Sequence, residues 1–283
     1  MFITYLFKGR TSNNLFQYFA AKILEKLLNS KSSQITIFEY KFINEINLND
    51  YQIKTIIDDF TFKFLYTQFK KGNFNIINNI NKDSIIILDG YFQWDFLLLE
   101  NKEFIQSLFV NSNDQINTQY NIGQFIKEIN DPKYINFFNE DDLVLHLRLD
   151  DFINEGYNSF VIHPNSYIDI IEKIQKQYSF KNIYVVVDKL RKKYEYEYIN
   201  KLKNKFNIII LNGTLFEDFA KIYHAKNILC NNSTFCWIPA FIGKSKLNWM
   251  PDKNTCDNQS FFKINENTIN YPIEYLYLHH FQI

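Results

Sequence analysis

Short apolar segments of strand type alternate with segments of helical periodicity along most of the chain, and this alternation constrains the fold more than any other feature. The predicted strands, rich in β-branched and aromatic residues, cover residues 2–7, 34–40, 84–88, 143–147, 183–187, 206–211 and 227–230. Apolar residues at helical spacing predict helices over residues 15–29, 102–110, 122–129, 166–178, 194–205, 215–224 and 234–242. Strands that alternate with helices are typical of an α/β fold with parallel sheets.

The alternation occurs twice, with a break around residues 131–142. A length of 283 residues is enough for two domains of ordinary size. We therefore expect two Rossmann-like domains facing a cleft, one over residues 1–140 and the other over residues 141–283.

Composition excludes several classes of protein. The chain has 31 basic and 31 acidic residues, which argues against a nucleic-acid-binding protein with a broad basic face. No apolar run is long enough to span a membrane, and the N-terminal residues have the pattern of a strand rather than of a signal peptide. The three cysteines lack the spacing of a zinc site, so we expect reduced, buried thiols. These features predict a soluble cytoplasmic protein.

Polar residues follow three of the predicted strands, where open α/β sheets bind their ligands. Arg148 follows the strand at 143–147, and guanidinium groups suit phosphate. Ser233 and Thr234 begin a helix, and helix N-termini attract anions. A loop at residues 9–14 follows the first strand and lets backbone approach a ligand. Together, the three segments suit a ligand that carries a diphosphate.

Several common motifs are absent from the sequence. It has no G-x-G-x-x-G and no P-loop, which weakens dinucleotide and ATP interpretations. It also lacks H-E-x-x-H and G-x-S-x-G, which weakens zinc protease and serine hydrolase interpretations.

Five segments match, in order, the motifs of one known family. Residues 9–20 (GRTSNNLFQYFA) are similar to G-G-L-G-N-Q-M-F-Q-Y-A-A, and residues 89–94 (DGYFQW) resemble G-Y-W-Q. Residues 146–152 (HLRLDDF) resemble H-x-R-R-G-D-Y, and residues 187–188 (VD) fall where the family has a strand that ends in S-D-D. Residues 231–237 (NNSTFCW) resemble N-S-S-F-S-W-W. The chain thus resembles glycosyltransferase family 11, the α-1,2-fucosyltransferase-like family, and more distantly the α-1,6- and protein O-fucosyltransferases.

This resemblance implies a GT-B fold with an N-terminal acceptor-side domain and a C-terminal domain that binds a GDP-sugar. It implies an inverting transfer that needs neither metal nor other cofactor. The expected reaction moves L-fucose from GDP-fucose onto a hydroxyl of an oligosaccharide or glycan acceptor, for example the 2-position of galactose.

The resemblance also implies which residues bind the donor. Arg148 matches the phosphate-contacting arginine, His146 the histidine beside the nucleotide, and Asp218 has a spacing similar to that of a guanine-contacting aspartate. The other residues expected on the donor side are Gly9, Arg10, Asp188, Ser233, Thr234 and Phe235.

Catalysis is expected to depend on Arg148 and on Asn13, which matches an asparagine at the sugar end of the donor. Asp151 is the first candidate for a general base, and Asp188 is the second. The residues expected on the acceptor side are Tyr91, Gln93 and Trp94.

The chain also departs from the family pattern. Leu149 replaces a second arginine and Asp150 replaces a glycine, so one cation is lost and one carboxylate is gained. Three alternatives therefore remain open: the same fold with another NDP-sugar donor, a non-catalytic glycan-binding module that uses aromatic side chains such as Trp94, and a metal-dependent transferase that uses Asp150 and Asp151.

Overall fold

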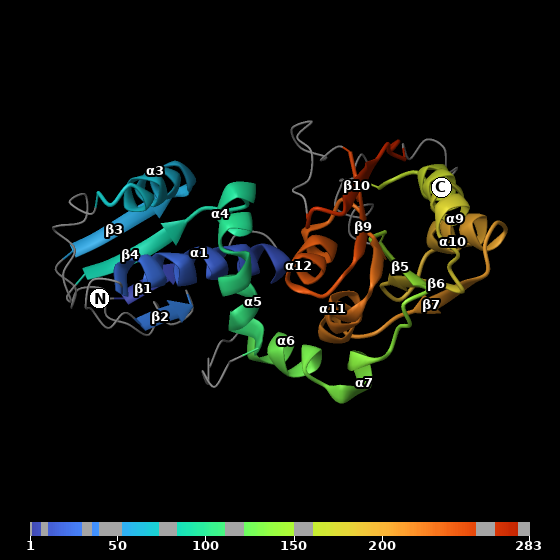
Figure 1. Cartoon of the computed structure of the whole chain (residues 1–283), viewed down its shortest axis with the longest axis horizontal. Coiled ribbons are helices and arrows are strands. Elements are labelled where there is room, and N and C mark those ends of the chain that lie inside the picture. The colour runs from blue at the N-terminus through green and yellow to red at the C-terminus, as the bar shows by residue number, and fades with distance from the viewer. Residues whose placement is uncertain are drawn as a thin grey trace. The chain divides into compact units, whose positions relative to one another are not determined.

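A computed structural model of the chain describes residues 2–6, 11–29, 36–39, 53–73, 84–110, 122–149, 161–252 and 264–276 (Figure 1). The chain divides into two compact units, Met1–Gly123 and Gln124–Ile283. The division falls earlier than residue 140, within the helix α6 (Ile122–Ile129). Among the described residues, no helix combines the length and the apolar character that crossing a membrane requires.

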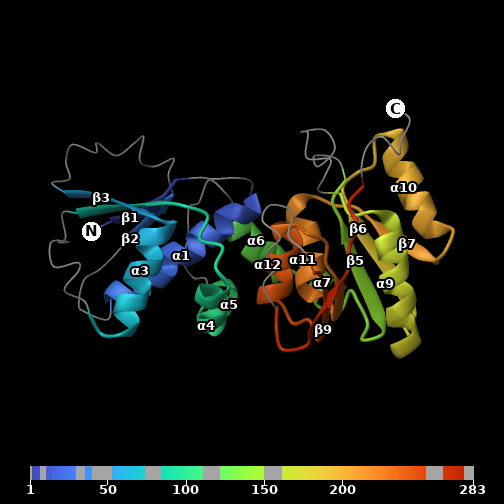
Figure 2. The same cartoon turned by 90° about the horizontal axis from the view of Figure 1, so that it is seen from above.

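Unit 1 contains, in its described part, a four-stranded parallel sheet with the order β2-β1-β4-β3. Its strands are β1 (Phe2–Tyr5), β2 (Thr36–Glu39), β3 (Ile53–Asp58) and β4 (Ser84–Asp89). Its helices are α1 (Thr11–Asn29), α3 (Asp59–Lys70), α4 (Asp95–Glu100) and α5 (Lys102–Val110). In Figure 2, α1 and α3 lie on the same side of the strands.

The sequence did not predict β3 and α3, and the reason lies in the aromatic pattern of α3. Phe60, Phe62 and Phe64 alternate with polar residues, which is a strand-like period of two. The helix instead buries Phe62 together with Leu65 and residues further along that face, and it leaves Phe60 83% exposed. The Asp58 side chain accepts a hydrogen bond of 2.8 Å from the Thr61 N–H and so caps the helix.

Gln17 of α1 joins the carboxyl ends of the two central strands of unit 1. Its side chain is fully buried, and its amide Nε2 donates to the carbonyl of Leu6, which follows β1, and to that of Gly90, 2.8 Å away, which follows β4. One side chain thus satisfies two backbone carbonyls that the sheet leaves unpaired.

Unit 2 contains a six-stranded parallel sheet, within the described residues, with the order β10-β9-β8-β5-β6-β7. Its strands are β5 (Asp142–Leu147), β6 (Asn182–Val187), β7 (Ile208–Leu211), β8 (Asn227–Leu229), β9 (Leu247–Pro251) and β10 (Thr268–Tyr271). Read from β7, this is the 3-2-1-4-5-6 order of the Rossmann fold. The expected α/β class with Rossmann-like units is confirmed.

Helices cover both faces of this sheet. They are α7 (Pro132–Ile135), α9 (Pro164–Gln177), α10 (Lys193–Lys203), α11 (Leu215–His224) and α12 (Thr234–Ile242). Figures 1 and 2 show α9 and α10 on one face and α11 and α12 on the other. The predicted ranges at 215–224 and 234–242 match α11 and α12, whereas β9 and β10 were not predicted.

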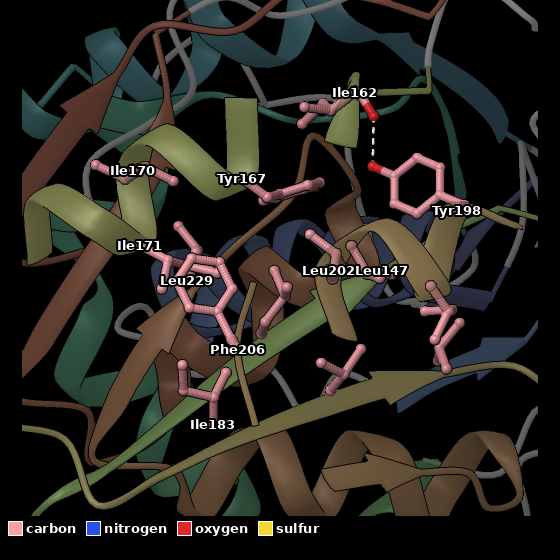
Figure 3. Packing of buried hydrophobic residues seen from close by; sticks show 14 of the residues in the cluster. Leu147, Ile162, Tyr167, Ile170, Ile171, Ile183, Tyr198, Leu202, Phe206 and Leu229 are labelled. Atoms are coloured by element: carbon pink, nitrogen blue, oxygen red, sulfur yellow. Dashed lines mark hydrogen bonds between the residues drawn. The ribbon is translucent and has the colours of Figure 1, made fainter. Parts of the chain in front are cut away.

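The core under α9 and α10 holds the unit 2 sheet in place. Figure 3 shows aliphatic side chains of β5 and β6 packed against Tyr167, Ile171, Tyr198 and Leu202. The Tyr198 hydroxyl donates to the Ile162 carbonyl, so this buried phenol is satisfied. This packing fixes the positions of β5 and β6, and therefore also the positions of the residues that directly follow these strands.

We predict that Gln17→Leu destabilises the protein by about 2–4 kcal/mol, because two backbone carbonyls lose their donor inside unit 1. Urea denaturation measures the change. Gln68→Leu is the control, since the Gln68 amide oxygen only accepts from Asn73 at an exposed position. Equal losses in both variants would contradict the joining role of Gln17.

Candidate functional site

The strand order of unit 2 reverses between β5 and β8. The chain passes from β5 through β6 to β7 on one side, and then returns to β8 on the other side of β5. In open α/β sheets the crevice at such a reversal, outside the carboxyl ends of the strands, binds the ligand. Arg148 directly follows β5, and the segment from Cys230 to Ser233 directly follows β8.

A hydrogen bond joins the two sides of this reversal. Arg148 Nη1 donates to Ser233 Oγ over 2.8 Å, although the residues are 85 positions apart. Ser233 is buried, and Arg148 is partly exposed. The remaining guanidinium donors belong to a rigid fork whose geometry matches phosphate. The structure thus brings together the cation and the helix start that the sequence placed at one site.

Ser233 also organises the N-terminus of α12. Its Oγ accepts a hydrogen bond of 3.2 Å from the Phe235 N–H, and its own N–H donates to Asn231 Oδ1 over 3.0 Å. Thr234 is the first residue of the helix. The helix dipole adds partial positive charge beside the guanidinium. Asn231, which shapes this turn, belongs to the motif at residues 231–237, but the sequence indicated no role for it.

His146 lies one residue before the end of β5 and is buried. Its ring centroid is 5.4 Å from that of Phe235, whose ring in turn lies 6.0 Å from that of Phe219 on α11. Both predicted residues lie close to the Arg148–Ser233 bond along the chain. His146 comes two residues before Arg148, and Phe235 comes two residues after Ser233.

Two buried thiols lie behind this turn. Cys230 and Cys236 have their sulfur atoms 2.8 Å apart, and both are unoxidised. Burial acts to raise the pKa of the Cys236 thiol, but hydrogen bonds from Cys230 and His146 and the Asn231 N–H lower it to about 6. Burial raises the pKa of the Cys230 thiol.

Asp218 of α11 is buried and bonds to a lysine that sequence reasoning did not single out. Lys221 Nζ donates to Asp218 Oδ1 over 2.7 Å, and both side chains are less than one tenth exposed. Burial raises the pKa of Asp218, while Lys221 and His146 act to lower it and Asp188 acts to raise it. Asp188 itself follows β6 and is exposed. The spacing of three residues within a helix was the signal that could have identified Lys221.

In unit 1, the structure pairs two predicted residues. Gln93 Nε2 donates to Asn13 Oδ1 over 3.0 Å, which joins the start of α1 to the segment between β4 and α4. Gln17, one helical turn after Asn13, holds the carbonyls of Leu6 and Gly90 at the same edge of the sheet.

Asp59 shapes the turn that carries Tyr91 and Gln93, and no sequence signal indicated this. Its carboxylate accepts from the N–H groups of Tyr91 and Phe92 over 3.0 and 2.8 Å. Phe92 has a φ of 52°, which is strained for an aromatic residue. A Cβ atom at Gly90 would lie 2.5 Å from the Asp59 carboxylate, so this close approach needs glycine.

The two remaining acceptor-side residues have different environments. Tyr91 is 45% exposed. The Trp94 ring, in contrast, is covered on one side by the Lys63 ammonium, 4.6 Å from the ring centroid, and contacts the Phe96 ring at 5.4 Å. Trp94, the residue that precedes α4, therefore contacts both Lys63 and Phe96.

The remaining predicted site residues, Gly9, Arg10 and Asp151, lie outside the described residues, as does Asp150. Within the part of the chain that the structure describes, no group of three or more His, Cys, Asp or Glu side chains is arranged to hold a metal ion.

We predict that Ser233→Ala lowers the free energy of unfolding by about 2–4 kcal/mol, because it removes both a helix cap and the acceptor of the Arg148 guanidinium. The matched variant Thr214→Ala removes only the cap of α11, in which Thr214 Oγ1 accepts from the Glu217 N–H. Its expected loss is about 1 kcal/mol. Chemical denaturation compares the two, and losses of the same size would show that the bond to Arg148 adds nothing.

Comparison with known proteins supports the fold. No family model and no curated protein matches the chain. Among solved structures, FUT1 of Arabidopsis thaliana, as the R284K mutant in complex with GDP, aligns with a TM-score of 0.50 and 9% identity over 91% of this chain and 72% of that chain. The E. coli heptosyltransferase WaaC with ADP aligns with a TM-score of 0.47 and 12% identity, over 96% and 93% of the two chains. The likeness to FUT1 concerns the fold alone, which is the α/β architecture of GT-B enzymes with two Rossmann-like units.

Proposed function

We propose that this protein is an inverting, metal-independent glycosyltransferase of the α-1,2-fucosyltransferase type. Its donor would be GDP-fucose, and its acceptor a hydroxyl of a galactoside or a related glycan. Unit 2 would bind the GDP-sugar, and unit 1 would supply the acceptor side.

The observation that supports this proposal most is the Arg148–Ser233 hydrogen bond at the reversal between β5 and β8. It places a guanidinium group at the N-terminus of α12, so that two sources of positive potential converge where a Rossmann-like sheet binds its ligand. This combination suits a diphosphate. The fold likeness to FUT1, whose structure contains GDP, supports guanine as the base.

In the proposed reaction, the bond between the sugar C1 and the oxygen of the β-phosphate breaks, and its electron pair remains on GDP. The acceptor oxygen forms the new bond to C1 from the opposite face and loses its proton, so the configuration inverts. Negative charge grows on the departing phosphate oxygen as the sugar becomes oxocarbenium-like. Arg148 and the N–H groups at the start of α12 would stabilise that charge.

The acceptor side is proposed from unit 1. Asn13, bonded to Gln93, would line the sugar end of the donor, and the exposed Tyr91 would contact the acceptor. Asp151, or Asp188 as the second candidate, would receive the acceptor proton.

We predict that Arg148→Met lowers the rate of GDP release from GDP-fucose by about 10²–10³-fold, because one donor to the developing phosphate charge is lost. Turnover with a galactoside acceptor measures the effect, and a thermal unfolding curve verifies folding. Arg191→Met is the control, since Arg191 is exposed in the segment that precedes α10, and turnover should remain unchanged. Equal rates for the two variants would contradict the proposed role of Arg148.

A second prediction concerns the donor and the metal. Calorimetry should show tighter binding of GDP than of UDP, and turnover should persist in the presence of a chelator. Tighter binding of UDP would contradict a GDP-sugar donor, and activity abolished by the chelator would contradict metal independence. Glycan binding without any release of GDP would favour a non-catalytic glycan-binding module.

A further inference from the structure

The ion pair within α11 is an unusual feature of unit 2. Asp218 and Lys221 are one helical turn apart, with 2.7 Å between Oδ1 and Nζ, and the residues are only 4% and 7% exposed. Removing both charges from water costs free energy that the attraction between them often fails to recover. Stability alone therefore gives no clear reason for a buried pair at this position.

The loop that follows β7 is built around this pair. A Cβ atom at Gly213 would lie 2.7 Å from Lys221 Nζ and 2.9 Å from Asp218 Oδ1. The pair thus lies directly against the backbone at the carboxyl end of β7. This is the edge of the sheet where Arg148 and Asp188 also follow their strands.

The charges around Asp218 decide whether it can act as an acceptor. Burial raises the pKa of Asp218 and so favours the protonated form. Lys221 opposes this with a hydrogen bond and its charge, the neighbouring His146 adds a smaller effect in the same direction, and Asp188 acts in the opposite direction. Lys221 is therefore the largest influence that favours the carboxylate.

We propose that Lys221 is a positioning residue that keeps Asp218 ionised and fixed, and that it thereby sets the preference of the site for a nucleobase with two adjacent N–H donors. This inference rests on the proposed function. A carboxylate offers about four lone-pair positions, of which the bond to Lys221 uses one. Guanine presents the N1–H and the 2-amino group side by side, which matches a carboxylate. Adenine presents an acceptor at N1, and hypoxanthine lacks the 2-amino group.

The test measures the binding of GDP, IDP and ADP by calorimetry over a range of pH. For Lys221→Met, GDP should bind about 10–100-fold more weakly at neutral pH, because the charged acceptor is lost or misplaced. The acidic pH at which GDP affinity declines should also move upward, since the main influence that lowers the pKa of Asp218 has been removed. Lys221→Arg should restore both properties, and Lys203→Met, at an exposed position of α10, should change neither.

Each outcome separates this inference from the proposed function. If the wild-type protein binds no GDP, the proposed function fails and the inference fails with it. If the wild type binds GDP and Lys221→Met binds it with the same affinity and pH profile, only the inference is overturned. Should Lys221→Met not fold, the double variant Asp218→Asn/Lys221→Met, which carries no buried charge, replaces it. This variant should lose the wild-type preference for GDP over IDP, and its retention would overturn the inference.

Discussion

One hydrogen bond, from the Arg148 guanidinium to Ser233 Oγ, joins the two halves of the unit 2 sheet at the point where the strand order reverses. The same Ser233 Oγ also accepts from the Phe235 N–H in the first turn of α12. One oxygen atom therefore holds both the guanidinium and the N-terminus of the helix. Because β5 is buried along its whole length, Arg148 starts from a rigid strand. The Arg148 guanidinium and the N-terminus of α12 are therefore held together above the buried core of unit 2.

Around this bond, the protein places charged and polar groups where burial alone would oppose them. Burial acts to raise the pKa of Asp218, and Lys221 acts to lower it. Burial also acts to raise the pKa of Cys236, and hydrogen bonds from His146 and Cys230 lower it. In unit 1, the neutral Gln17 amide and the Asp59 carboxylate bond to backbone atoms at the carboxyl edge of the sheet. In both units, polar side chains bond to the turns that follow the strands, and those turns carry the residues to which we assign function.

The sequence predicted the elements whose patterns were unambiguous. The helices α5, α6, α11 and α12 have the predicted bounds, because their apolar residues follow a clear helical period. The helix α3 was missed because its phenylalanines alternate as in a strand, and only packing on the sheet selects the helix that buries Phe62. The strand β10 was missed because it has only four residues, too few for the alternation of Ile269 and Tyr271 with polar residues to indicate a strand.

The sequence by itself determined the alternating α/β class, the position of Arg148 after a buried strand, and the Ser233 cap of a late helix, since these depend on local periodicity and local backbone chemistry. Only the tertiary structure decided that Arg148 bonds to Ser233, that Gln93 bonds to Asn13, and that Lys221 is buried with Asp218. The first two contacts join residues about 80 positions apart, and strand order rather than spacing along the chain brings them together. The spacing of three residues in a helix allows Asp218 and Lys221 to form an ion pair, but only the packing of the tertiary structure buries that pair away from water.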